Sequence, residues 1–172
     1  RYIKFCGKKI NSLRKEFRIT QGKRKFSKIS IDSQVAKDSK IINILILDCE
    51  RKWALGALYN QRLTSLDSVV SEWRYKTKQK FAKASKLAEN MLNVCRERCD
   101  DQTCQEAEAY YHTMNANYNT YSRKFQAAID SYKLAKEIYQ KISLVKDSIE
   151  AFVYKDKIKF ITLQIRFCEY NL

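Results

Sequence analysis

The sequence contains no proline, one histidine and three glycines. Turn-rich β folds use more glycine and proline, whereas long helices with short connections can be built without either residue. The same shortage excludes the glycine-rich loops that cradle phosphate groups. A catalytic site of the Ser-His-Asp or Cys-His type would depend on one residue, His112, which we expect to be a packed or surface histidine. The composition therefore predicts an all-α fold and no catalytic residues.

Long apolar runs are also missing. The longest uncharged apolar stretch, residues 41–47, is interrupted by Asn43 and is far shorter than the roughly 18 residues that a membrane-spanning helix needs. Hydrophobic residues make up 45% of the 172 residues and charged residues 31%, a balance typical of a globular protein. We therefore expect a single helical domain over residues 1–172 that buries a core without disulfides or metals, and no membrane span.

The six cysteines lack the spacing of a metal site. Cys95, Cys99 and Cys104 follow a C-x3-C and C-x4-C pattern upstream of His112, whereas zinc sites favour C-x2-C. We therefore predict no metal and no cofactor. The other three cysteines occupy apolar positions and are expected to be reduced core residues: Cys6, Cys49 and Cys168. Six unpaired thiols favour a reducing compartment.

The formal net charge of +15 is concentrated in two segments. Residues 1–28 hold eleven Lys or Arg against one acid, and residues 72–86 hold six against one. Outside these segments the numbers of bases and acids are equal. Two basic patches on a neutral body are the expected footprint of a polyanion partner, since a solubilising charge would be spread more evenly.

The first basic patch has the periodicity of an amphipathic helix over residues 1–19, ended by Gly22 and followed by a flexible basic linker, so that helix and linker occupy 1–31. Apolar side chains fall in an arc of about 100°, and a separate arc of about 140° is almost purely cationic. Like charges stand four residues apart, which destabilises a helix unless an anion compensates. We therefore predict a binding surface for an anionic partner, made of Arg1, Lys4, Lys8, Lys9, Arg14, Lys15, Arg18, Lys23, Arg24, Lys25 and Lys28.

Five further helices are indicated by apolar periodicity and by Asp-Ser pairs, which favour helix starts. The predicted helices cover residues 39–64, 68–99, 102–122, 124–142 and 146–171, and the Asp-Ser pairs stand at 32–33, 38–39 and 67–68. Gly56 lies inside one of these helices and indicates close helix packing rather than a break. The whole chain therefore predicts about six mostly antiparallel helices.

The second basic patch falls on the predicted helix 68–99. Its bases form a predicted secondary RNA-binding patch: Arg74, Lys76, Lys78, Lys80 and Lys83. Aromatic residues close to basic ones can stack on unpaired bases. Trp73 and Tyr75 beside this patch, and Phe26 in the linker, are the aromatic candidates.

Two helices share a spacing of small and aromatic residues. Phe125, Ala128, Tyr132 and Ala135 have the spacing of the second helix of a tetratricopeptide repeat, in which alanines let paired helices approach. Phe81, Ala84, Ala88 and Met91 repeat the pattern 44 residues earlier. The period exceeds the usual value of about 34 residues, so we interpret the arrangement as tetratricopeptide-like.

A cationic helix suits RNA, DNA or an anionic membrane surface. Tyr2, Phe5 and Phe17 would supply the bulky apolar contacts of a membrane-surface helix, but the narrow apolar arc is better suited to docking on the protein itself. An A-form RNA major groove is deep and narrow, so a helix enters it where a bulge, loop or junction widens it. We therefore expect structured RNA with an irregular element, and no DNA, as the partner.

Four segments, in order, resemble the RNA-binding region of the 68-kilodalton subunit of the eukaryotic signal recognition particle. They are RYIKFC at 1–6 with LRK at 13–15, LILDCERKWA at 45–54, AAIDSYKLAKEIYQKI at 127–142 and IRFCEYNL at 165–172. The resemblance implies a tetratricopeptide-like domain that places an arginine-rich helix in the particle's RNA near a three-way junction. Several family arginines are lysines here, which contact phosphate as point charges without a bidentate fork.

The resemblance also implies a cellular role. It implies a part in co-translational protein targeting, cytoplasmic localisation with a nuclear or nucleolar assembly stage, and pairing with a 72-kilodalton subunit through a region absent from this sequence. A different hypothesis remains open from the helical pattern alone. In that alternative the chain is a tetratricopeptide-like scaffold that binds an acidic protein partner.

Overall fold

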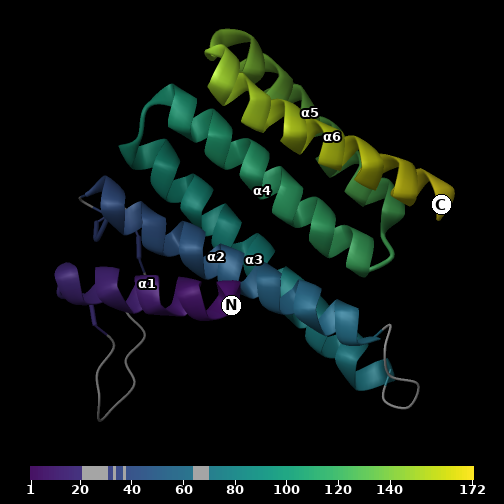
Figure 1. Ribbon diagram of the computed structural model, residues 1–172, viewed down its shortest axis with the longest axis horizontal. Coiled ribbons are helices and arrows are strands. Elements are labelled where there is room, and N and C mark those ends of the chain that lie inside the picture. Colours follow the sequence, from purple (N-terminus) through teal and green to yellow (C-terminus); the bar gives the residue numbers. More distant parts are fainter. Residues whose placement is uncertain (21–30, 33, 37, 64–69) are drawn as a thin grey trace.

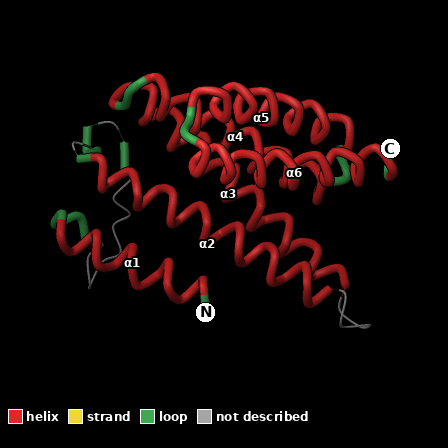
Figure 2. Tube along the Cα trace, turned by 45° about the horizontal axis from the view of Figure 1, so that its top comes forward, coloured by secondary structure: helices red, strands yellow, loops and turns green. Residues whose placement is uncertain are grey.

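The computed structural model describes residues 1–20, 31–32, 34–36, 38–63 and 70–172. These residues form six helices and no strand, which confirms the predicted all-α class (Figure 2). The helices are α1 (Tyr2–Glu16), α2 (Ser39–Leu63), α3 (Val70–Arg98), α4 (Asp101–Tyr121), α5 (Phe125–Val145) and α6 (Ser148–Tyr170).

Each helix packs chiefly against its neighbours in the sequence. The connections at 99–100, 122–124 and 146–147 have two or three residues, and connections this short make consecutive helices antiparallel. Figures 1 and 2 show the result, a row of helical hairpins in which α1 lies along the first part of α2 and α6 lies at the opposite side of the molecule. This neighbour-to-neighbour packing is the arrangement of helical repeat proteins.

Aspartate side chains cap two helices where the sequence predicted starts. The Asp38 carboxylate accepts a hydrogen bond of 2.8 Å from the Lys40 backbone N–H at the start of α2. The Asp100 carboxylate accepts bonds of 3.2 Å from the backbone N–H and 2.7 Å from the hydroxyl of Thr103, which lowers the pKa of Asp100. Asp32 also accepts bonds from nearby backbone N–H groups but starts only a turn. The pair at 67–68 lies outside the described residues.

The first helix ends earlier than the sequence predicted. α1 stops at Glu16 instead of continuing to Ile19. Arg18 adopts the left-handed conformation with φ of 55°, a conformation that a helix cannot continue through. Gly22, the predicted stop, lies outside the described residues, and the helix has already ended before it.

Two backbone hydrogen bonds close this end of α1. The Ile19 N–H donates to the Arg14 carbonyl at 3.0 Å, and the Arg18 N–H donates to the Lys15 carbonyl at 3.2 Å. This pair of bonds is a Schellman motif, in which the left-handed position is usually a glycine. Ile19 packs against the core cluster, so tertiary packing stabilises a turn that Arg18 alone would disfavour.

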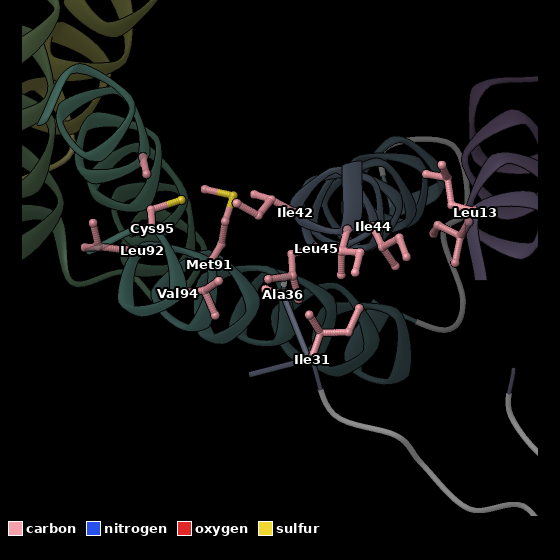
Figure 3. Close-up of a cluster of buried hydrophobic side chains, with 13 residues drawn as sticks. Leu13, Ile31, Ala36, Ile42, Ile44, Leu45, Met91, Leu92, Val94 and Cys95 are labelled. Atoms are coloured by element: carbon pink, nitrogen blue, oxygen red, sulfur yellow. The ribbon is translucent and has the colours of Figure 1, made fainter. Parts of the chain in front are cut away.

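The core beneath α1 joins the first four helices. Ile10 and Leu13 of α1 lie in one cluster with Ile44 and Leu45 of α2 and with Met91 of α3 (Figure 3). Leu13 and Ile44 face each other across the α1–α2 interface in Figure 3. Burying such side chains contributes about 1.5–3 kcal/mol each, so α1 is docked on the body of the protein by its apolar face.

Small residues let the later helices approach closely, as predicted. Ala128, Tyr132 and Ala135 are buried between α4, α5 and α6. A Cβ atom added to Gly56 would lie 3.0 Å from the ring of Phe81. Gly56 therefore allows α2 to contact Phe81 of α3, as its position inside a helix indicated.

Candidate RNA interface

The helix α1 separates an apolar face from a cationic one. Cys6, Ile10 and Leu13 are buried against α2, and their spacing of four and three residues places them on one side of the helix. The first turn has no acidic residue, and the residue at the N-cap, Arg1, makes no side-chain capping bond. An N-terminus without negative charge forgoes the usual stabilisation by the helix dipole, so this helix is not optimised for its own stability.

Three contacts outside the core fix α1 on α2. The Tyr2 hydroxyl donates a hydrogen bond of 3.0 Å to Glu50 Oε2. The Lys40 ammonium lies 3.5 Å from the carboxylate of Glu16, which is the sole acid of α1. Gly7 lies under the Arg51 guanidinium, whose Cζ would be 3.7 Å from an added Cβ. The helix is thereby held with its cationic face outward.

Six of the predicted RNA-binding side chains are exposed on this helix and its end. They are Arg1, Lys4, Lys8, Lys9, Lys15 and Arg18. Within the described part of the chain, none of the six forms an ion pair or a side-chain hydrogen bond. Within the helix, Lys4, Lys8 and Lys15 fall along one stripe, and Lys9 lies apart from it. The fold therefore presents a row of unpaired cations to any anionic ligand.

The remaining predicted residues of this first patch differ from these six. Arg14 is half-buried and its guanidinium donates a hydrogen bond of 3.2 Å to the Ile19 carbonyl. Arg14 therefore supports the end of the helix as well as adding charge. Four linker residues lie outside the described residues: Lys23, Arg24, Lys25 and Lys28.

Exposed aromatic side chains accompany the cationic stripe. Phe5 is 57% exposed and Tyr2 48% exposed, and their rings stack with centroids 6.4 Å apart. Phe17, grouped with them in the sequence, is instead half-buried against the core. The structure therefore leaves two of the three aromatic residues available for contact with bases or lipids.

The second basic patch is divided between two faces of α3. Arg74 and Lys78 line a cleft near the α4–α5 turn. Lys76 faces away from them, pairs with Glu72 and lies 4.8 Å from the centre of the Trp73 ring. Lys80 and Lys83 lie on the same face of α3 as Lys76 and form no ion pair with any described residue. This face therefore carries a second row of cations: Lys76, Lys80 and Lys83.

The two aromatic candidates beside this patch have different environments. Trp73 is contacted by the Tyr59 ring at 5.3 Å and by the Arg62 guanidinium at 5.4 Å, so its faces are engaged within the protein. Tyr75 is 63% exposed, and its hydroxyl accepts a hydrogen bond of 2.8 Å from Gln79. Tyr75 is therefore the better stacking candidate. Phe26 lies outside the described residues.

The side chains of Cys95, Cys104 and His112 take part in the packing between helices. The Cys104 thiol donates to the Cys95 carbonyl at 3.2 Å, and burial raises the pKa of the Cys95 thiol to about 12. Burial also lowers the pKa of His112, whose ring lies 5.2 Å from that of Tyr111. Among the described residues, no three His, Cys, Asp or Glu side chains meet in a geometry that would hold a metal ion.

No helix within the described ranges has the length and apolar character needed to cross a membrane.

Comparison with known proteins identifies relatives over the whole chain. Residues 1–172 match the family model described as RNA-binding signal recognition particle 68. The chain is 28% identical over 178 residues to signal recognition particle subunit SRP68 of Dictyostelium discoideum, and 27% identical over 188 residues to that of Caenorhabditis elegans. Both alignments cover 100% of this chain but only 28% and 29% of the relatives. The chain thus spans less than a third of their length.

A solved structure has the same fold. The SRP68-RBD of Chaetomium thermophilum superposes with a TM-score of 0.86 at 19% sequence identity. The match covers 98% of this chain and 79% of that one. At this identity the likeness establishes the helical architecture described above.

Proposed function

The chain belongs to the RNA-binding signal recognition particle 68 family, and on that premise we propose that it holds the particle's RNA through the cationic face of α1. One observation carries the proposal. Six exposed cations on α1 and its end have no acidic partner in the described chain, while the opposite face is docked on α2. RNA phosphates would supply the missing negative charge.

The form of the RNA follows from the size of the helix. With its side chains the helix α1 is about 10–12 Å across, and the narrow A-form major groove admits a helix of that width only where an irregular element widens it. We therefore propose a three-way junction, in agreement with the resemblance in the sequence. Lysine ammoniums contact phosphates as point charges, so the row of lysines fixes position more than base identity.

Further residues and partners extend this proposal. The linker cations that follow α1 in the sequence are assigned to the same RNA contact, and the row Lys76, Lys80 and Lys83 is assigned to the secondary patch. In this proposal residues 1–172 act as one non-catalytic domain with no role for DNA. The same reasoning assigns a part in co-translational targeting, a cytoplasmic location with a nuclear or nucleolar assembly stage, and a 72-kilodalton partner bound by another region of the protein.

The proposal is tested by charge reversal at Lys4 and Lys8, both exposed and unpaired in the described chain. These positions are preferable to Arg14 and Arg18, because Arg14 donates to Ile19 and Arg18 forms the helix end. The experiment measures affinity for signal recognition particle RNA containing the junction, against a perfect duplex of equal length, at two salt concentrations. Lys4→Glu with Lys8→Glu should reduce the salt slope of binding by about 2 and abolish the preference for the junction.

A matched variant controls for net charge. Lys133→Glu with Lys141→Glu makes the same charge change on exposed positions of α5 and should leave the preference for the junction intact. Equal loss of affinity in both double variants would mean a generic polyanion surface. Unchanged affinity in the Lys4 and Lys8 variant, with helicity preserved, would show that α1 is not the interface.

A second candidate function is supported by a groove on another side of the fold. A groove of about 510 Å³ lies between α2, α4, α5 and α6, with Trp53, Tyr110, Phe152 and Phe160 in its walls. This apolar lining suits a protein segment, as the scaffold alternative requires, but its charged lining residues are two acids, Glu50 and Asp156, and one base, Lys157. The test measures the binding of an acidic peptide to the wild-type protein and two variants. This function predicts that Phe152→Ala abolishes binding and that the Lys4 and Lys8 variant retains it.

A further inference from the structure

A large cleft lies far from α1. It has a volume of about 910 Å³ and lies where the end of α2, the start of α3, the α4–α5 turn and the end of α6 meet. That volume falls in the range of about 300–1,000 Å³ typical of ligand-binding clefts. Figure 1 shows these four helix ends on one side of the molecule, away from most of α1. The cleft is therefore separate from the proposed RNA-binding face.

The charge in this cleft is of one sign. Arg74 and Lys78 of α3 and Arg123 of the α4–α5 turn line it, and none of its described lining residues is acidic. Within the described chain none of the three cations forms an ion pair. Arg74 and Lys78 are separated by one helical turn and share a face. Three unpaired cations around one concavity suit a bound anionic group.

The turn that supplies Arg123 is strained. Arg123 adopts φ of 57°, and its N–H donates to the Thr120 carbonyl at 3.0 Å while the Lys124 N–H donates to the Asn119 carbonyl at 2.9 Å. These bonds form a Schellman motif whose left-handed position usually belongs to glycine. A bulky residue there costs on the order of 1 kcal/mol. Strain of this kind concentrates at ligand-binding positions.

Aromatic rings form the walls of the same cleft. Tyr75 is 63% exposed and Phe167 is 51% exposed, and both line it. Tyr121 also lines it, and its ring is stacked on the buried ring of Phe81 with centroids 4.1 Å apart and planes 6° apart. A planar ligand can therefore add to an aromatic stack that the core holds rigidly.

One buried polar group of the cleft has no partner among the described residues. Thr77 lines the cleft and is 2% exposed, and its Oγ1 has no hydrogen-bond partner among the described residues. A buried hydroxyl without a partner costs about 1–3 kcal/mol. The amides of Asn60 and Gln164 also line the cleft. Together these groups offer the donors and acceptors that a base edge requires.

We propose that this cleft binds one unpaired nucleotide of the RNA. The base stacks among Tyr75, Tyr121 and Phe167, and the flanking phosphates contact Arg74, Lys78 and Arg123. Cations combined with exposed aromatic rings are the combination by which proteins bind single-stranded nucleic acid. An acidic peptide would use the cations but leave the stacking surface unused. The inference rests on the proposed RNA-binding function but not on the α1 interface.

The experiment uses the whole chain and a single-stranded RNA tetranucleotide containing 2-aminopurine, whose fluorescence falls when it stacks. Wild-type protein should bind it with quenching. Tyr75→Ala and Phe167→Ala should each weaken binding about 5- to 150-fold, the effect of losing one aromatic stacking partner. Tyr75→Phe should retain both binding and quenching, because the ring is kept.

Two matched variants complete the design. Phe152→Ala removes an aromatic ring of similar exposure from the same helix as Phe167, but from a different groove, and should bind the tetranucleotide normally. The Lys4 and Lys8 charge reversal should also bind it normally while losing the junction RNA. Normal tetranucleotide binding by both variants would support the proposal. The affinity of the Lys4 and Lys8 variant for the junction RNA tests the α1 interface separately.

Two results would overturn the proposal. In one, Tyr75→Ala and Phe167→Ala bind the tetranucleotide as tightly as wild type. In the other, an acidic peptide binds in place of the RNA and is lost in Arg74→Ala but not in Tyr75→Ala, which would make the cleft a protein-binding site.

Discussion

The hydroxyl of Tyr110 donates a hydrogen bond of 2.7 Å to Glu50 Oε1, joining α4 to α2. Glu50 accepts a second bond from Tyr2 of α1 through its other oxygen. One carboxylate therefore links three helices, and burial raises the pKa of Tyr110, which keeps its hydroxyl protonated as the donor.

We predict that Tyr110→Phe destabilises the protein by about 1.5–3 kcal/mol, because the bond to a charged acceptor is lost inside the fold. Urea unfolding followed by circular dichroism measures the change. Tyr111→Phe on the same helix is the control, since the half-buried Tyr111 hydroxyl has no hydrogen-bond partner among the described residues. Equal effects of the two substitutions would contradict the assignment.

Alanine at two helical glycines should have opposite effects. A Cβ at Gly56 would lie 3.0 Å from the buried Phe81 ring, so Gly56→Ala should destabilise by about 1–2 kcal/mol through overpacking. A Cβ at Gly7 would meet the Arg51 guanidinium at an ordinary 3.7 Å, so Gly7→Ala should stabilise by about 0.5–1 kcal/mol through helix propensity. Denaturant midpoints measure both, and effects of the same sign would refute the packing argument.

Relief of backbone strain should stabilise the protein at a functional cost. Arg123→Gly places at φ of 57° the residue that tolerates it best, and should raise stability by about 1 kcal/mol. The same variant should bind the single-stranded tetranucleotide more weakly, because a cation leaves the cleft. Arg123→Ala, which loses the charge without relieving the strain, should weaken binding without stabilising. Thermal unfolding combined with the binding assay separates these two effects.

Alkaline pH should lower the free energy of unfolding, because the buried hydroxyl of Tyr139 ionises. Burial raises its pKa from 10.0 to about 12. Because the folded pKa lies above the unfolded one, the stabilising contribution is fully present below pH 10 and is lost as the pH rises to 12. The loss is about 2–3 kcal/mol at pH 12. Tyr139→Phe should flatten this part of the stability profile, measured by urea unfolding at stepped pH, whereas an unchanged profile would contradict it.

Much of this fold follows from local patterns in the sequence. Helices α2 to α6 begin and end within a few residues of their predicted bounds, because a 3.6-residue apolar period and caps such as Asp38 and Asp100 act locally. The predicted end of α1 was wrong because Arg18 occupies a left-handed position that is normally taken by glycine. The packing of Ile19 against the core stabilises this turn. Only tertiary contacts make that turn favourable.

The candidate sites were harder to predict from the sequence than the fold was. The exposed α1 cations followed from helical periodicity, but the cleft joins Arg74, Arg123 and Phe167, which are far apart in the chain. Arg123 falls between the predicted helices 102–122 and 124–142, and no sequence pattern links it to Arg74. Trp73 looked equivalent to Tyr75 in sequence, and only the fold shows that Tyr59 and Arg62 contact it.

The neighbour-to-neighbour packing of the helices makes local opening possible without global unfolding. α1 packs chiefly against α2, so it can detach while the hairpins beyond it remain folded, as terminal units of linear arrays do. Amide exchange should therefore be graded, fastest in α1 and slowest in the central helices. A ligand that binds along α1 would protect the amides at that end of the array far more than those of α4.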